Sequence, residues 1–305
     1  MAIRLTEFFG HAVADPRGVS FARERRCPFV NSDCIKPEHG SCSVEALRNS
    51  APVICCANRL YDGNFQILKQ VADKAFDADH RIISPTEART LRRQGGLLGN
   101  EVVAFGRYFG QELPLPKAGG AAGAYYMDWV LVKTGPDGRA SELTALEIQT
   151  IDTTGNYGEQ SALAFDGEEF TDTQGRTPGY SESGFNWENV NKRILPQVIY
   201  KGHALRRERL CKRGFFFACP KQVLDRIMGR LGGVSGLHEY PLQPGTVTFL
   251  AYDLGLPNAV DGTRPLRLPT SFTTTIDQVA LAFTAPRNLP EAGVYELAAN
   301  LALGG

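Results

Sequence analysis

Two short segments carry acidic and amide side chains in an arrangement that could bind a cation. Asp128 stands in the segment Tyr-Met-Asp-Trp, and Glu147 and Gln149 stand in the segment Leu-Glu-Ile-Gln. Side chains two residues apart on a strand face the same way, so Glu147 and Gln149 share one face, and the leucine and isoleucine beside them point into the core. If the two segments pair at their ends as strands of a hairpin, Asp128 lies beside Glu147.

Two carboxylates on one face indicate metal-dependent hydrolysis. They raise each other's pKa, and a divalent cation relieves the repulsion. Mg²⁺ binds hard oxygen ligands and keeps several waters, one of which can attack a phosphodiester. This is the chemistry of an Asp…Glu-x-Lys nuclease, with Gln149 in the place of the lysine. Glutamine can orient water or phosphate but supplies no positive charge. A half-exposed strand with one polar face would give the same pattern.

Five of the seven cysteines fall within a segment of about thirty residues near the N-terminus, and such clustering indicates a metal site. Their spacing is Cys27-x6-Cys34-x7-Cys42-x13-Cys56, with Cys55 as an alternative fourth ligand. Four thiolates form a closed tetrahedral site for zinc or iron, which is structural because no position stays open for substrate. The spacing matches no standard zinc finger. His39 could replace one thiolate, and a set of unlinked buried cysteines is the alternative interpretation.

Length and charge narrow the class of protein. The 305 residues suit one large domain or one domain with a small appendage. A net charge of zero argues against a protein that coats DNA without specificity. Positive charge is therefore local, with candidates at 23–26, 89–93 and 206–213, although a run of this kind is more often a solvated face. No apolar run is long enough to cross a membrane and no signal peptide is evident, so we expect a cytoplasmic protein.

Apolar periodicity predicts the elements that must position these side chains. We find no clear element in 1–26 and no sustained period in 27–58, and we expect a long loop over 153–185. A kink is expected at Pro196, within a helical stretch of apolar residues that begins at Trp187. The predicted elements are helices over 64–76, 84–93, 187–198 and 223–231, strands over 125–133, 143–151, 215–218 and 246–254, and a short helix followed by a loop from Ile276. This alternation predicts an α/β fold around a mixed sheet.

Several segments together resemble the family of the restriction endonuclease NotI. They keep their order from residue 7 to about residue 200; beyond 220 we see little similarity, and Pro196 is a departure. The segments are Glu7-Phe8-Phe9-Gly10-His11, Cys27-Pro28-Phe29, Cys34-Ile35-Lys36, Gly40-Ser41-Cys42-Ser43-Val44, Cys56-Ala57-Asn58-Arg59, Gly110-Gln111-Glu112-Leu113, Met127-Asp128-Trp129, Leu146-Glu147-Ile148-Gln149-Thr150 with Asp152, Gly155 and Tyr157, and Asn189-Val190 with Lys192, Arg193 and Gln197.

The resemblance implies a PD-(D/E)XK nuclease core, with a central mixed sheet flanked by helices, and a small four-cysteine metal-binding subdomain at the N-terminus. We expect the subdomain within residues 1–62 and the nuclease domain over 63–305. The resemblance selects Cys56 over Cys55 and implies iron, or zinc, on the ligands Cys27, Cys34, Cys42 and Cys56. It also implies Asp128, Glu147 and Gln149 as catalytic residues, with Mg²⁺ on the two carboxylates and Glu112 as a further metal contact.

The resemblance further implies a type II restriction endonuclease that acts as a homodimer on a palindromic, GC-rich site in double-stranded DNA. We expect DNA contacts from Lys192 and Arg193, although a solvated helix face explains them equally well. One alternative is a repair nuclease of the same superfamily that cuts by DNA structure, which a discrete fragment pattern would exclude. Another is a metal-stapled DNA-binding protein without catalysis, which would bind DNA without Mg²⁺-dependent cleavage.

Overall fold

The computed structural model describes residues 2–36, 40–47, 49–77, 79–96, 99–115, 125–155, 157–233, 236–285, 289 and 291–304. His39, one of the candidate metal ligands, lies outside them. Within these residues, no helix has the length and apolar character needed to span a bilayer.

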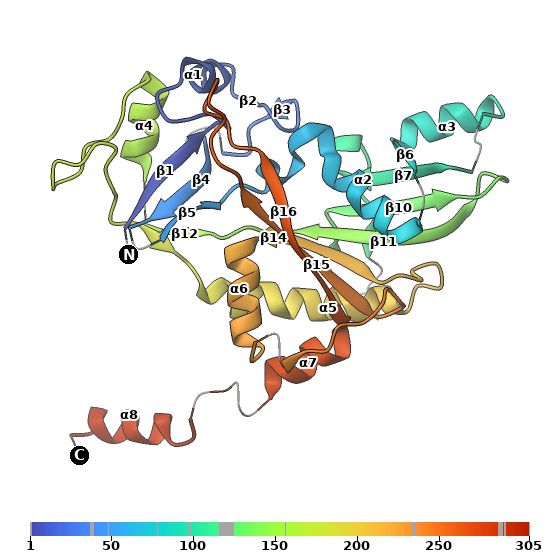
Figure 1. The fold of residues 1–305 in the computed structure, drawn as a ribbon. Helices are drawn as coiled ribbons and strands as arrows, with labels where there is room; N and C mark the ends of the chain where they lie inside the picture. The colour runs from blue at the N-terminus through green and yellow to red at the C-terminus, as the bar shows by residue number, and fades with distance from the viewer. Residues whose placement is uncertain are drawn as a thin grey trace.

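A seven-stranded mixed sheet forms the centre of the fold (Figure 1). Its strands are β6 (Arg81–Ile83), β7 (Glu101–Gly106), β10 (Trp129–Thr134), β11 (Ala140–Ile148), β14 (Phe215–Pro220), β15 (Thr246–Leu254) and β16 (Leu266–Thr275). They lie in the order β16-β15-β14-β11-β10-β7-β6. The strands β11, β14 and β15 are parallel, whereas β10 runs antiparallel to both of its neighbours. The predicted α/β architecture around a mixed sheet is confirmed.

Helices cover both faces of this sheet, as Figure 1 shows. One face packs against α5 (Leu195–Arg206), α6 (Lys221–Arg230) and α7 (Ile276–Thr284), and the other against α2 (Asp62–Phe76). Strand β14 shows the division within one segment: Phe215 and Phe217 join the core on the α5 side, and Phe216 and Ala218 join the core on the α2 side. A strand buried on both faces reads as a continuous apolar run, which is why this one was predictable.

The N-terminal region contains regular structure that the sequence pattern does not reveal. Strands β1 (Ile3–Phe8), β4 (Ser41–Ala46) and β5 (Asn49–Ile54) form an antiparallel sheet in the order β1-β4-β5. Helices α1 (Pro16–Arg23) and α4 (Gly158–Asp166) pack together beside it, and α4 also contacts β1. The expectation of no clear element in 1–26 is therefore wrong. Register shifts within both strand pairs interrupt the alternation from which strands are predicted.

Side chains of this small sheet belong to the same buried cluster as the α5 face of the central sheet. Ile3 and Val44 share that cluster with Phe217 and Val223. The predicted division of the chain at residue 62 stays a prediction.

The remaining elements include three that differ from expectation. Helix α4 lies inside the segment predicted as a loop, and β16 and α8 (Val294–Ala302) were not predicted. Helix α8 stands apart from the sheet, and none of its residues is buried (Figure 1). The others are β2 (Arg26–Cys27), β3 (Ser32–Asp33), the 3-10 helices η1 (Ala57–Tyr61) and η2 (Arg107–Phe109), α3 (Pro85–Arg93), β8 (Pro114–Leu115), β9 (Tyr125–Tyr126), β12 (Thr153–Thr154), β13 (Gly184–Phe185) and the π-helix η4 (Val190–Ile194).

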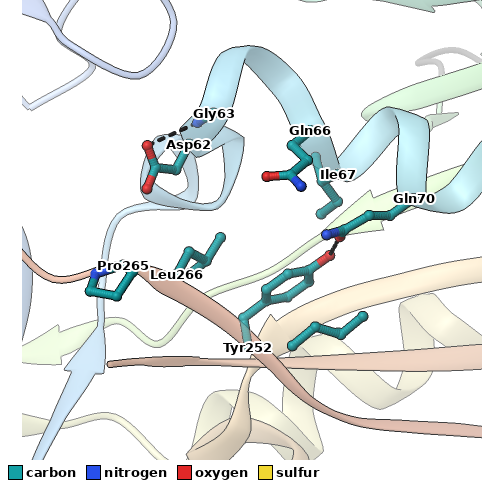
Figure 2. A pocket seen from close by; sticks show the side chains of 9 residues that line it. Asp62, Gly63, Gln66, Ile67, Gln70, Tyr252, Pro265 and Leu266 are labelled. Carbon is teal, nitrogen blue, oxygen red and sulfur yellow. Dashed lines mark hydrogen bonds between the residues drawn. The ribbon is translucent and has the colours of Figure 1, made fainter. Parts of the chain in front are cut away.

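Helix α2 closes over the edge of the sheet formed by β15 and β16, and a cavity of about 200 Å³ remains between them. Figure 2 shows Tyr252 reaching from β15 to α2, where its hydroxyl donates a hydrogen bond to Gln70 at 2.6 Å. The cavity contains one carboxylate, Asp62, and this side chain accepts from the backbone N–H of Gly63 (Figure 2).

Candidate active site

The hairpin of β10 and β11 brings the two predicted carboxylates together. Trp129 pairs with Leu146 in the antiparallel register, so Asp128, one residue before Trp129, lies at the level of Glu147. The backbone N–H of Ile148 donates to Oδ2 of Asp128 at 2.7 Å. The predicted hairpin is confirmed, and its register is the one that places the two carboxylates side by side.

The two carboxylates are coupled electrostatically. Burial and the negative charge of Glu147 raise the pKa of Asp128 to about 7, and the charge of Glu112 adds to this rise. The N–H of Ile148 and the ammonium of Lys201 act in the opposite direction but do not overcome it. A carboxyl with a pKa this high lacks a sufficient positive partner within the chain. Such perturbed groups are typical of functional sites.

Glu147 is buried, with 4% of its surface exposed, and its two oxygens differ in their partners. Oε1 accepts from Nζ of Lys201 at 2.5 Å and from Nε2 of Gln149 at 3.2 Å. Oε2 is buried and has no hydrogen-bond partner among the described residues. A buried carboxylate oxygen without a donor is costly, so this atom is the one that is free to take a ligand.

Lys201 is the residue of this site that the sequence reasoning missed. It lies on α5 and is the one buried lysine of the described chain, with 5% of its surface exposed. A signal was present in the sequence: Lys201 follows Val198 by three residues and precedes Leu205 by four, which places a lysine on the apolar face of a helix. Buried lysines are rare unless they are paired.

Gln149 joins the site to a neighbouring cavity. Its backbone N–H donates to the carbonyl of Ala218 at 3.0 Å, which continues the pairing of β11 with β14. Its side chain lines a cavity of about 170 Å³ together with Asp152, Asn189 and Arg193. Asn189 donates to Oδ2 of Asp152 at 2.7 Å, and Arg193 lies 3.6 Å from the same oxygen.

The predicted DNA-contacting residues lie on the rim of the site. Lys192 and Arg193 are both exposed on η4, the π-helix that leads into α5. Arg193 lines the cavity beside Gln149. At Pro196, where a kink is expected, the helix changes its winding: the π-helix η4 ends at Ile194 and α5 follows directly, with the proline in its first turn.

Glu112 lies on the other side of Asp128. It is exposed and shares a cavity of about 230 Å³ with Asp128, Arg107 and Tyr108. The two cavities both touch Ala57, at the start of η1, so they are neighbours: one is lined by Asp128 and Glu112, and the other by Gln149. The structure thus brings Asp128, Glu147 and Gln149 together and leaves Glu112 at the mouth of the adjoining cavity.

The donor set suits Mg²⁺ better than a softer ion. Within the described residues, no group of three or more His, Cys, Asp or Glu side chains is placed to hold a metal ion. The pair that the hairpin brings together, Asp128 and Glu147, offers a cation two carboxylates. Mg²⁺ is commonly bound by one or two carboxylates and keeps waters in its other positions. The unpartnered Oε2 of Glu147 and the raised pKa of Asp128 are what such an ion would relieve.

The cysteines do not form the predicted metal centre in this structure. The described chain holds no group of thiols placed to share a metal ion. Their sulfurs instead contact protein polar groups: Asn58 donates to Cys27 at 3.7 Å, Cys42 to the carbonyl of Gly40 at 3.6 Å, and Cys55 lies 3.3 Å from Oγ of Ser41. Burial raises the pKa of the Cys56 thiol to about 12. The prediction of Cys27, Cys34, Cys42 and Cys56 as one ligand set is therefore not confirmed.

Comparison with family models gives a match over the part of the chain that carries the site. The family model described as restriction endonuclease NotI matches residues 17–215, which include both carboxylates, Gln149 and Lys201. No curated protein matches the chain. The match ends near the start of β14, so the strands β15 and β16 and the helices α6 to α8 lie outside it.

Proposed function

Because the chain belongs to the family of the restriction endonuclease NotI, we propose that it is a Mg²⁺-dependent type II restriction endonuclease with a PD-(D/E)XK core. The observation that carries this proposal is the pairing of Asp128 with Glu147 at the end of the β10–β11 hairpin. The positive groups of the chain do not fully balance the charge of these two carboxylates, so the pair is suited to binding a cation. The two adjoining cavities leave room beside it for a phosphodiester.

Each residue of the site has a proposed role. Asp128 and the free Oε2 of Glu147 hold the cation, and Glu112 is a further contact from the cavity mouth. Mg²⁺, when bound, supplies positive charge that stabilises the negative charge developing on the phosphate. Gln149 orients the attacking water by hydrogen bonds. Water adds to phosphorus, the bond to the 3′-oxygen breaks, and the products carry a 5′-phosphate and a 3′-hydroxyl.

The proposal extends to the substrate. Lys192 and Arg193, exposed beside the cavity that Gln149 lines, contact the DNA. A homodimer would match the two-fold symmetry of a palindromic site and cut both strands together. A GC-rich palindrome is proposed from the sequence resemblance.

The structural iron or zinc site is proposed from the resemblance in sequence alone. If Cys27, Cys34, Cys42 and Cys56 do hold a metal, their side chains must turn from their present partners toward one another. Metal analysis of the purified protein tests this: one equivalent of iron or zinc that is lost in Cys34→Ser would support it, and metal-free folded protein would refute it.

The function is tested by incubating the full chain with several large DNAs, with Mg²⁺ or with EDTA, and separating the products by electrophoresis. Discrete fragments that form only with Mg²⁺ are expected, and sequencing their ends gives the site. A smear would indicate a structure-selective or nonspecific nuclease. DNA binding without cleavage of any genome tested would indicate a binding protein and overturn the proposal.

A further inference from the structure

Lys201 on α5 supplies the positive charge that the Glu-x-Gln motif of Glu147 and Gln149 lacks. Glu147 on β11, Gln149 directly after this strand and Asp128 beside them carry no positive charge. The ammonium of Lys201 lies 2.5 Å from Oε1 of Glu147, and both side chains are almost fully buried, at 7% and 5% exposure. Burying such a pair costs desolvation on both sides, and this cost is recovered only with good geometry and further hydrogen bonds. Here one oxygen of the pair is left without a donor. An arrangement made for stability alone would pair both oxygens.

We propose that Lys201 is a positioning residue of the nuclease site: it holds Oε1 of Glu147 and thereby leaves Oε2 as the single oxygen that this carboxylate offers to the cation. The inference rests on the function proposed above. A carboxylate held by one oxygen binds an ion through the other, whereas a free carboxylate can bind it through both. Lys201 thus fixes how Glu147 approaches the ion and limits the negative charge of the site.

The fold places this ammonium rigidly. Residues on both sides of Lys201 along the buried face of α5, Val198 and Leu205, belong to the core. At Gly202 the helix approaches its neighbours so closely that a Cβ would lie 2.3 Å from Cδ1 of Ile276. Because α5 cannot shift away without leaving this contact, the ammonium stays under β11, on the face to which Glu147 points.

The proposal predicts opposite changes in metal affinity and in catalysis. When Lys201→Gln removes the charge but keeps a hydrogen-bond donor, Glu147 can bind the cation with both oxygens. Mn²⁺ should therefore bind about threefold to tenfold more tightly, because the competing positive charge is gone. Cleavage should slow on the order of tenfold or more at saturating metal, because the ion is no longer held in its working position.

The experiment measures Mn²⁺ binding by calorimetry without DNA, and single-turnover cleavage with Mg²⁺, on the full chain. Lys201→Arg keeps the positive charge beside Oε1, so its Mn²⁺ affinity should stay closer to that of the parent than the affinity of Lys201→Gln does. Lys221→Gln, an exposed lysine on α6 that pairs with Asp225, is the matched control and should change neither.

Two results would overturn the role of Lys201. One is a Lys201→Gln protein with the Mn²⁺ affinity and the cleavage rate of the parent. The other is an equal loss of cleavage in Lys201→Gln and Lys201→Arg together with weaker Mn²⁺ binding in both, which would indicate that the bond to Glu147 only stabilises the fold. Mn²⁺ binding needs no substrate, so it tests the role of Lys201 even if the parent protein cuts no DNA. A parent protein that binds Mn²⁺ but cuts no DNA would count against the proposed function alone. A parent that binds no Mn²⁺ would overturn both.

Discussion

The indole of Trp129 donates a hydrogen bond from Nε1 to the hydroxyl of Tyr61 at 3.0 Å, and both residues are buried. Trp129 follows Asp128 directly, and Tyr61 is the last residue of η1, where the chain enters α2. This bond therefore ties the start of β10, which carries one carboxylate, to the segment that covers the site. Their rings also meet edge to face, with centroids 5.9 Å apart.

Tyr61→Phe should weaken both the fold and the site. The substitution leaves the buried N–H of Trp129 without its acceptor, which costs about 1–3 kcal/mol in free energy of unfolding. Because Asp128 is held next to that indole, cleavage should also slow. Urea denaturation and cleavage rates check the two effects. Tyr252→Phe is the control: it too loses a buried hydroxyl's hydrogen bond, to Gln70, but in the remote cavity of Figure 2, and its cleavage rate should equal that of the parent.

Asp128→Asn should separate stability from activity. The amide keeps an oxygen that can accept from the N–H of Ile148 and removes the repulsion with Glu147, so the metal-free protein should be at least as stable as the parent. Cleavage should fall on the order of 100-fold or more, because one of the two cation ligands is lost. DNA binding measured in EDTA should be unchanged. An Asp128→Asn protein that cuts at the parental rate would remove Asp128 from the site.

Gly202→Ala should act on the site from a distance. The added methyl would meet Ile276 at 2.3 Å and Phe215 at 3.0 Å, and relief requires α5 to move. Overpacking of this kind costs about 1–3 kcal/mol, and the shift carries Lys201 away from Glu147. Thermal unfolding and cleavage should both report a loss. Gly229→Ala on α6 has nothing within 4 Å of the added carbon and should be neutral or slightly stabilising; equal effects at both positions would argue against this account.

Asp172 should make stability depend on pH in the acid range. Burial alone would raise its pKa, but the N–H groups of Tyr180, Arg176 and Gln174 and the Arg176 guanidinium hold the pKa well below the ordinary 3.8. Above pH 3.8 the group is charged in the folded and the unfolded chain, so its contribution to stability is fully present. As the pH falls below 3.8 the unfolded chain is protonated first, and the contribution is lost toward the folded pKa.

The corresponding variant is Asp172→Asn. It should unfold at lower urea concentration than the parent at pH 7, and the difference should shrink as the pH falls below 3.8. Asp225→Asn, at an exposed pair on α6, is the control and should show little difference at either pH. A gap between Asp172→Asn and the parent that stays constant down to pH 2 would contradict the assignment.

Local patterns in the sequence were sufficient to predict the helices and strands whose apolar residues recur regularly, and to find the two carboxylates. The helix of Asp62–Phe76 and the buried strand of Phe215–Pro220 follow from apolar spacing. The helix predicted over 84–93 is Pro85–Arg93, and Ser84 caps its start. Asp128, Glu147 and Gln149 were found because alternation along a strand and the order of a hairpin are local properties. The bulged N-terminal sheet and α4 were missed because their periods are broken or short.

The sequence by itself thus determined which residues could carry the chemistry and that β10 and β11 pair. Only the tertiary structure decided which side chain completes the site. Lys201 is 54 residues from Glu147 in the chain, and its ammonium reaches Oε1 only because α5 packs on the sheet face to which Glu147 points. It also decided which polar groups the cysteine sulfurs contact, such as Asn58 at Cys27 and Ser41 at Cys55. Spacing limits which groups can meet, but packing between distant segments selects which of them do.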